Sequence, residues 1–186
     1  MRASAAGALV YPGAVTPVTH VLTTDRLVLR PAAPSDHARL LTHWNLPEVR
    51  RFMFDGAVMS AAEVTGVIDE STATFRDAGY GLWLASVSNG GELVGTAGLR
   101  PLDDLGLEII YSLAPAAWGK GYATEAAGAV LDYALGPLAL PEVLAEIDEG
   151  NAASVAVARR LGMTAFDTVP GLLGPMTRYR RTASTG

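Results

Sequence analysis

Three segments with the alternating polarity of β-strands follow one another between residues 82 and 113. Leu82–Ser88 and Glu92–Arg100 flank Asn89-Gly90-Gly91, a sequence typical of a hairpin turn. A second turn rich in aspartate and glycine precedes Leu107–Leu113. Strands joined by such short turns run antiparallel. We therefore predict an antiparallel meander in the middle of the chain, which restricts the fold to sheets that contain one.

Helical and strand patterns surround the meander on both sides. The first half predicts one strand and then helices, the last of which begins with the capping box Ser60-Ala61-Ala62-Glu63. After the meander, helices and strands alternate. The predicted elements there are the helices Thr124–Ala134 and Ala152–Leu161 and the strands Val143–Ile147, Met163–Thr168 and Met176–Thr182. The fold class is α/β (α+β), with a mixed, mostly antiparallel twisted sheet of about six or seven strands flanked by helices.

Composition removes several classes of function. The 186 residues include no cysteine and three histidines, so disulfide scaffolds, thiolate metal sites and cysteine nucleophiles are excluded, and we expect no metal site. Lys and Arg total 14 against 19 Asp and Glu, a net charge of −5, which gives no basic surface for nucleic acid. No uncharged apolar run reaches the ~18 residues that span a bilayer, so we expect no membrane partner.

The chain divides into two parts of unequal size. Residues 1–20 are rich in Ala, Gly, Val and Pro and carry one permanent charge, so we predict a disordered extension. Residues 21–186 form the predicted domain. The apolar stretch of the extension is short and ends at Pro12, which argues against a secretory signal, and a cytoplasmic location is the expectation.

The most informative stretch is Trp118-Gly119-Lys120-Gly121-Tyr122-Ala123-Thr124-Glu125-Ala126, which follows a strand and opens a helix. Glycines permit the positive φ angles and close backbone approach that an anion site needs. A helix start adds free N–H groups and partial positive charge. Lys120 is the only lysine in the chain. The stretch predicts a site for a pyrophosphate.

Other interpretations of this glycine-rich turn are possible. A Walker A loop needs Gly at position 114, which is Ala, and Ser or Thr after the lysine, where Gly121 stands. A dinucleotide-binding G-x-G-x-x-G needs Gly at position 124, which is Thr. A plain strand-to-helix turn without a ligand remains the alternative.

The turn resembles the acyl-CoA loop of the GCN5-related N-acetyltransferase (GNAT) superfamily, whose motif is [QR]-x-x-G-x-[GA]. Gly121 and Ala123 match it, and Trp118 occupies the Gln/Arg position, as is usual in the RimJ/RimL-like branch. Asn151-Ala152-Ala153-Ser154, followed by Leu161-Gly162-Met163, resembles the second motif of the family. The resemblance extends over roughly residues 22 to 181.

The resemblance implies acetyl transfer from acetyl-CoA to a primary amine by direct attack in a ternary complex. It implies that two central strands splay apart to form the acetyl-CoA cleft, and that a backbone N–H near Leu113 stabilises the oxyanion. The residues that it assigns to acetyl-CoA are Ser112, Leu113, Trp118, Gly119, Lys120, Gly121, Tyr122, Ala123, Thr124, Asn151 and Ser154.

The resemblance also supplies candidate catalytic residues. Glu108 lies on the strand expected to splay and is the candidate base that deprotonates the amine. Many members of the family use a Tyr acid at the position that is Ala158 here. Ser154 is then the best substitute, followed by Tyr111, and departure of the thiolate without a protein acid is the alternative.

The acceptor amine stays open between a protein N-terminus and a small molecule. Trp44, Tyr80 and Trp83 are the candidate substrate-binding residues, although the pattern around both tryptophans fits a core position equally well. A loop over Val169–Pro175 is expected to edge the same pocket. A non-catalytic acyl-CoA-binding or sensing module is the main alternative function, and a nucleotide-binding protein is the other. A monomer or a homodimer is expected, with Met176–Thr182 as an edge strand for pairing.

Overall fold

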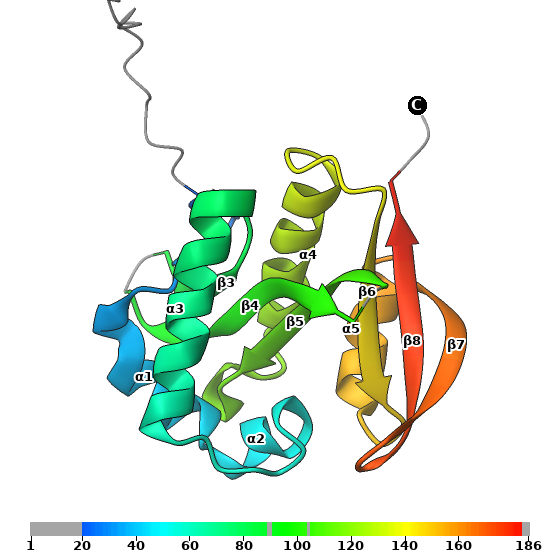
Figure 1. The fold of residues 1–186 in the computed structure, drawn as a ribbon, viewed down its shortest axis with the longest axis horizontal. Helices are drawn as coiled ribbons and strands as arrows, with labels where there is room; N and C mark the ends of the chain where they lie inside the picture. The colour runs from blue at the N-terminus through cyan, green and yellow to red at the C-terminus, as the bar shows by residue number, and fades with distance from the viewer. Residues whose placement is uncertain (1–19, 89–90, 104, 184–186) are drawn as a thin grey trace, which may run out of the picture.

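A single twisted sheet of eight strands runs through the computed structural model, which describes residues 20–88, 91–103 and 105–183 (Figure 1). The strands are β1 Leu22–Thr23, β2 Leu27–Pro31, β3 Leu82–Val87, β4 Leu93–Leu102, β5 Gly106–Leu113, β6 Glu142–Asp148, β7 Thr164–Gly171 and β8 Gly174–Thr182. Their order is β1-β2-β3-β4-β5-β6-β8-β7. The count exceeds the six or seven predicted because the two-residue β1, too short for a periodic signal, pairs with β2.

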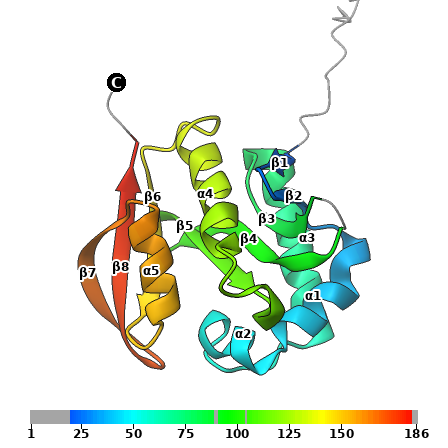
Figure 2. The same ribbon diagram turned by 180° about the vertical axis from the view of Figure 1, so that it is seen from behind.

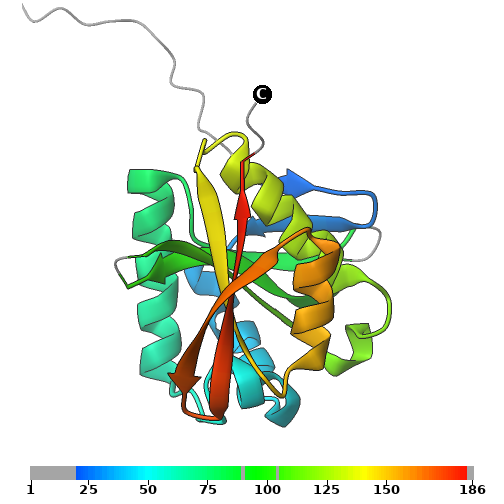
Figure 3. The same ribbon diagram turned by 90° about the vertical axis from the view of Figure 1, so that its right-hand side faces the viewer.

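The sheet opens at its centre. All neighbouring strands are antiparallel except β5 and β6, which run parallel and share one paired position, Glu108 with Leu144. Beyond that position the two strands separate, and Figure 3 shows β6 and β8 running steeply across the direction of β4. The predicted antiparallel meander and the splayed central strands are both confirmed.

Helices cover both faces of this sheet. On one face lie α1 His37–Trp44, α2 Pro47–Met53 and α3 Ala61–Ala78 (Figure 1), and on the other lie α4 Tyr122–Leu135 and α5 Ala152–Arg160 (Figure 2). Successive side chains of β5 point alternately to these two faces of the sheet. Ile109 and Leu113 are buried in the core beneath α4, whereas Ile110 packs with the cluster of α1 and α3. The face that carries Glu108, Ile110 and Ser112 is therefore the α1–α3 face.

Local signals in the sequence account for the helix ends. Ser60 Oγ accepts a hydrogen bond from Glu63 N (3.2 Å), and Glu63 Oε2 accepts one from Ser60 N (2.7 Å), so the predicted capping box forms. Helix α3 ends at Gly79 with φ of 77°, the left-handed conformation that favours glycine. Residues 89 and 90 of the predicted hairpin turn lie outside the described residues, as does the predicted extension apart from His20.

The end of the chain differs from the expectation in two ways. The segment 169–175 is not a loop, because β7 and β8 continue to Gly171 and Gly174 and form a tight hairpin. Pro170 is compatible with a strand because β7 is at the sheet edge, where no N–H is needed on the outer side. Strand β8 lies between β6 and β7, so the exposed edge belongs to β7 and not to Met176–Thr182.

Gly95 permits the close approach of β4 to β5. A Cβ at this position would lie 2.0 Å from the Ser112 carbonyl oxygen. We expect Gly95→Ala to lower the free energy of unfolding by about 3 kcal/mol, because one strand must shift away from the other.

Urea unfolding tests this expectation. The matched control is Gly66→Ala in α3, where a Cβ meets no atom within 4 Å and where we expect stabilisation of about 0.5–1 kcal/mol. Similar effects of the two substitutions would contradict the steric explanation.

Candidate active site

The loop between β5 and α4 has the geometry of an anion site. Gly119 and Gly121 adopt φ angles of 73° and 81°, and Gly121 occupies the N-cap position of α4. No side chain caps the helix, so the first N–H groups of α4, from Tyr122 to Thr124, point out of its first turn without a capping partner. The loop and Lys120 are exposed. These residues lie where the sequence predicted a pyrophosphate site.

The beginning of the domain holds this loop in place. Arg26 donates from Nη1 to the Lys120 carbonyl (2.8 Å), stacks over the ring of Tyr122 (4.8 Å) and pairs with Glu125. Thr24 Oγ1 also donates to Glu125 Oε1 (2.6 Å). The sequence analysis missed Arg26, since 94 residues separate it from Lys120 and no local pattern connects them.

The end of β5 offers backbone groups to a ligand. Because β5 pairs with β6 only at Glu108, the main chain over Tyr111–Leu113 has no strand partner on that side. Trp118 is 53% exposed, and its Nε1 donates to the Leu113 carbonyl (2.9 Å). The tryptophan at the Gln/Arg position of the loop motif thus fixes the loop to the end of the strand.

The start of α5 closes the same cleft from the other side. Asn151 Oδ1 accepts a hydrogen bond from Ser154 N (3.1 Å) and so caps the helix. Tyr111 donates its hydroxyl to the Ser154 carbonyl (3.2 Å). Burial raises the pKa of the Tyr111 phenol, so its proton stays in place at neutral pH. The structure therefore brings together the two residues predicted as candidate acids.

Glu108 lies at the closed end of the splay. It is 3% exposed, and its Oε1 accepts a hydrogen bond from Arg100 Nε (2.7 Å). Burial raises the pKa of the Glu108 carboxyl, and the negative charge of Glu146 acts in the same direction, while Arg100 opposes both. A carboxylate with a raised pKa at this place has the property that a general base requires.

A pocket of about 280 Å³ opens on the α1–α3 face beside Arg100 and Ile110. Its lining is mainly apolar and aromatic and includes Trp44, Phe54 and Tyr80. Trp44 meets Phe54 edge to face (centroids 5.4 Å apart). Two of the three predicted substrate-binding residues, Trp44 and Tyr80, therefore line one pocket next to the partner of Glu108.

Trp83 does not belong to that pocket. It is 0% exposed and packs against Phe75 and Tyr133, and its Nε1 donates to the His20 carbonyl (2.5 Å). The prediction of Trp83 as a substrate-binding residue is wrong, because the alternation of β3 turns this side chain into the core beneath α4.

A buried polar chain lies under the end of β5. His43 Nε2 and Ser112 Oγ are 2.9 Å apart, and Ser112 Oγ is 2.8 Å from Thr96 Oγ1. Burial lowers the pKa of His43 to about 4, so the imidazole is neutral at physiological pH. The sequence analysis gave His43 no role. The chain ties α1 to both β4 and β5 at the level of the cleft.

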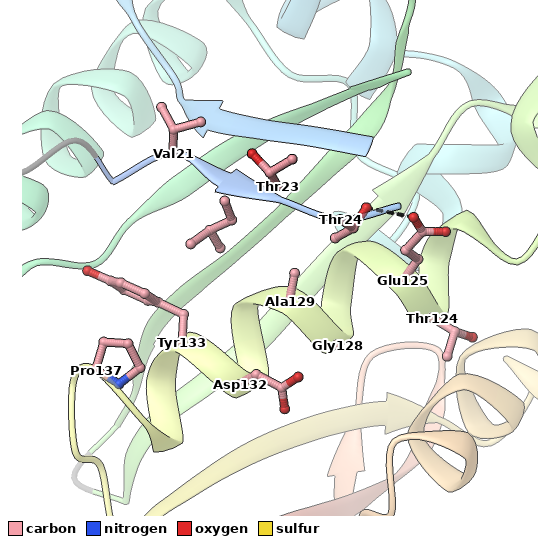
Figure 4. A pocket seen from close by; sticks show the side chains of 11 residues that line it. Val21, Thr23, Thr24, Thr124, Glu125, Gly128, Ala129, Asp132, Tyr133 and Pro137 are labelled. Atoms are coloured by element: carbon pink, nitrogen blue, oxygen red, sulfur yellow. Dashed lines mark hydrogen bonds between the residues drawn. The ribbon is translucent and has the colours of Figure 1, made fainter. Parts of the chain in front are cut away.

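A larger hollow of about 580 Å³ lies elsewhere, between β1 and α4 (Figure 4). Its lining includes Leu22, Thr24, Glu125 and Tyr133. Thr24 and Glu125 are hydrogen-bonded to each other. None of its lining residues is Glu108, Tyr111 or Ser154, so we do not assign the reaction to it. Within the described residues there is no group of three or more potential metal ligands and no helix long and apolar enough to cross a membrane.

Comparisons with known proteins agree with this geometry. A family model described as an acetyltransferase (GNAT) domain matches residues 26–164. YkkB of Bacillus subtilis (strain 168), an uncharacterized protein, is 32% identical over 164 residues, which cover 86% of this chain and 94% of YkkB.

Solved structures share the fold. An acetyltransferase from Agrobacterium tumefaciens str. C58 has a TM-score of 0.75 and 26% identity, with coverage of 97% of this chain and 99% of that one. RimL, a ribosomal L7/L12 alpha-N-protein acetyltransferase in complex with coenzyme A, has a TM-score of 0.75 and 17% identity, with coverage of 87% and 97%.

The fold, the loop and the splayed strands thus define an acyl-CoA-dependent transferase. The chain belongs to the GNAT acetyltransferase family, as the motifs around Gly121 and Asn151 predicted. Acetyl transfer from acetyl-CoA is the activity of this class.

The loop glycines allow a direct test of acetyl-CoA binding. We expect Gly121→Ala to weaken coenzyme A binding about tenfold or more, because a side chain strains the left-handed N-cap and faces Arg26 Nη2 at 3.4 Å. Calorimetry measures the affinity.

The control for Gly121 is Gly56→Ala. Gly56 has the same φ of 81° but open space around it and no place in the loop. An equal loss of coenzyme A affinity in both variants would show that the effect is only destabilisation.

Proposed function

We propose that this protein transfers acetyl from acetyl-CoA to a primary amine by direct attack in a ternary complex. The observation that carries the proposal is the single paired position between β5 and β6, which leaves an open cleft beside the uncapped start of α4. The loop from Trp118 to Thr124 holds the pyrophosphate, and the free backbone edge of Tyr111–Leu113 pairs with the pantetheine amides.

We assign the two substrates to opposite faces of the cleft. Acetyl-CoA enters from the α4 and α5 face, and the acceptor enters from the α1–α3 face, where Glu108 and the pocket of Trp44 and Tyr80 lie. Glu108 takes a proton from the ammonium, directly or through water. A backbone N–H near Leu113 stabilises the oxyanion, and Tyr111 or Ser154 donates a hydrogen bond to the departing sulfur.

The lining of the pocket supports an acceptor with an apolar group near the amine. Phe54 and Tyr80 present mostly apolar surface over the buried Trp44, and Glu70 and Arg100 are the charged residues of the lining. Both the first residue of a peptide and a small apolar amine satisfy this description. A protein N-terminus is favoured by the RimJ/RimL-like motifs and by the shared fold with RimL, which is named as an alpha-N-protein acetyltransferase.

Thiol release from acetyl-CoA tests the function. The panel contains short peptides that differ at residue one, polyamines, aminoglycosides and free amino acids. We expect turnover with one class of primary amine and none with the corresponding N-acetylated compound.

The panel also decides between the two kinds of acceptor. Turnover confined to peptides would establish N-terminal acetylation, whereas turnover of a small amine alone would exclude it. Tight coenzyme A binding with no turnover of any amine would favour the non-catalytic sensing module instead.

A further inference from the structure

Two buried side-chain polar atoms lack a hydrogen-bond partner among the described residues, Trp44 Nε1 and Asp148 Oδ1. Trp44 belongs to the acceptor pocket already described. Asp148 is 7% exposed, and nothing so far explains it. A buried carboxylate oxygen without a donor is costly, and native proteins keep few such groups without a reason. Asp148 is therefore a group that a ligand can satisfy.

Asp148 lies at the open end of the splay. It is the last residue of β6, four positions beyond Leu144, and Leu144 is paired with Glu108. On β5, Ser112 is likewise four positions beyond Glu108. Asp148 therefore lies across the gap between β5 and β6 at the level of Ser112, where the acetyl group is expected. Because strand side chains alternate, Asp148 shares a face with Glu146, which interacts with Glu108 on the acceptor side.

A second carboxylate, the solvent-exposed Asp55 in the turn after α2, is near enough for its charge to act on Asp148. The negative charge of Asp55 adds to burial in raising the pKa of the Asp148 carboxyl. Asp55 has a φ of 52°, and Gly56 N, which follows it, donates to the Arg50 carbonyl (2.9 Å). This aspartate thus adopts a left-handed conformation next to the acceptor side of the cleft.

The cations nearby are engaged elsewhere. Arg178 of β8 pairs with Glu146 (2.7 Å) and approaches Asp167. On α2, Arg50 donates to the Gly56 carbonyl and Arg51 stacks on Phe52. His43 of α1 is neutral and is bonded to Ser112. Among the described residues, neither Asp148 nor Asp55 has an ion-pair partner; Asp55 is exposed to solvent, so Asp148 is the buried carboxylate that lacks a cation.

We propose that Asp148, with the charge of Asp55 nearby, binds the ammonium of the acceptor amine in the ternary complex. The inference rests on the proposed function and assigns its acceptor to the class of alkylammonium cations. A primary ammonium has a pKa of ~10.4 and is charged at neutral pH, so it supplies both the missing donor and the missing positive charge. The pocket of Trp44 and Tyr80 then receives the apolar part of the acceptor.

In this arrangement the bonds and protons of the acetyl transfer balance. Glu108 lies four strand positions from the level of Asp148, so it accepts one proton from the bound ammonium through intervening water, which leaves a neutral amine with a lone pair. The nitrogen forms a bond to the acetyl carbon, and the carbon–sulfur bond breaks with its electron pair on sulfur. The nitrogen loses a second proton, which ends on the thiolate to give free coenzyme A. Asp148 holds the nitrogen near the carbonyl carbon and does not change protonation state.

Binding by Asp148 and proton removal by Glu108 predict different kinetic effects. We expect Asp148→Asn to raise the KM for the acceptor at least tenfold and to change kcat less than threefold, because a charge-assisted contact is lost but the base remains. Asp55→Asn raises the KM by a smaller factor. The matched control is Glu149→Gln, the exposed neighbour, which leaves the KM unchanged.

Two further measurements separate this inference from folding and from the proposed function. The melting temperature of Asp148→Asn should equal or exceed that of the wild type at neutral pH, because a buried unpaired carboxylate is removed. Chemical-shift titration of the coenzyme A complex with butylammonium should saturate in the wild type and not in Asp148→Asn, with 1-butanol as the neutral comparison.

The outcomes are distinct. A wild type that acetylates no amine but binds butylammonium through Asp148 would defeat the proposed function and keep the inference. A wild type that acetylates amines with a KM equal to that of Asp148→Asn would overturn the inference alone. Equal responses to butylammonium and 1-butanol would also overturn it.

Discussion

Replacement of Glu108 by Gln is expected to lower kcat by about 10²–10⁴-fold, the range typical of a lost general base. The amide keeps the size of the side chain and can still accept a hydrogen bond from Arg100. Coenzyme A affinity should therefore stay within about threefold of the wild type, since Glu108 lies at the closed end of the splay, away from the loop. Steady-state kinetics with the best amine of the panel and calorimetry with coenzyme A measure the two quantities.

The pH dependence of kcat tests the role of Glu108 as a base more directly. Glu108 acts as a base only when ionised, so kcat falls as the pH drops through its raised pKa. Removal of the Arg100 guanidinium by Arg100→Met removes a charge that lowers this pKa, so the acid limb should move to higher pH. Glu92→Gln, at an exposed position on β4's hairpin, is the control. Full turnover of Glu108→Gln at every pH would show that another group takes the proton.

The second large effect concerns the stability of the fold in acid. Burial holds the pKa of His43 at about 4, below the ordinary value of 6.5. A histidine with a lowered pKa favours the folded state above pH 6.5, and that contribution is lost as the pH falls toward 4. The difference of about 2.5 pKa units corresponds to roughly 3 kcal/mol, a large part of the stability of an ordinary domain.

Urea unfolding of wild type and His43→Gln between pH 7 and pH 4 tests this effect. The variant should be less stable at pH 7, because the fit against Ser112 is altered, but its stability should depend less steeply on pH. His37→Gln, at the other end of α1 where the ring is only partly buried, should keep the dependence of the wild type. Parallel curves for all three proteins would contradict a buried neutral His43.

The side of the cleft proposed to receive the acceptor was the least predictable part of the candidate site. Gly121 and Asn151 each belong to a short pattern with a local meaning, and the family resemblance pointed to Glu108 on the strand expected to splay. Nothing local marked Asp148 or Asp55, which come from the end of β6 and the turn after α2. Their proximity depends on how far β6 diverges from β5, and that divergence is a property of the whole sheet.

Local physics explains what the sequence determined by itself. The capping box at Ser60, the helix end at Gly79 and the antiparallel meander each depend on residues within one or two turns of the chain, and all appear in the structure. The loop from Trp118 to Thr124 is of the same kind, because a strand, two glycines with positive φ and a helix start follow one another directly.

Tertiary packing decided the rest, because the energies involved come from partners distant in sequence. Trp83 and Trp44 have similar local patterns, yet the register of β3 buries the former in the α4 core and the packing of α1 places the latter beside a pocket. Pro170 and Pro175 look like loop residues, but they pair with each other across β7 and β8, which keeps this segment extended. Arg26 fixes the loop from Trp118 to Thr124 only because the start of β2 lies beside the start of α4, a contact between residues 26 and 125 that no sequence pattern encodes.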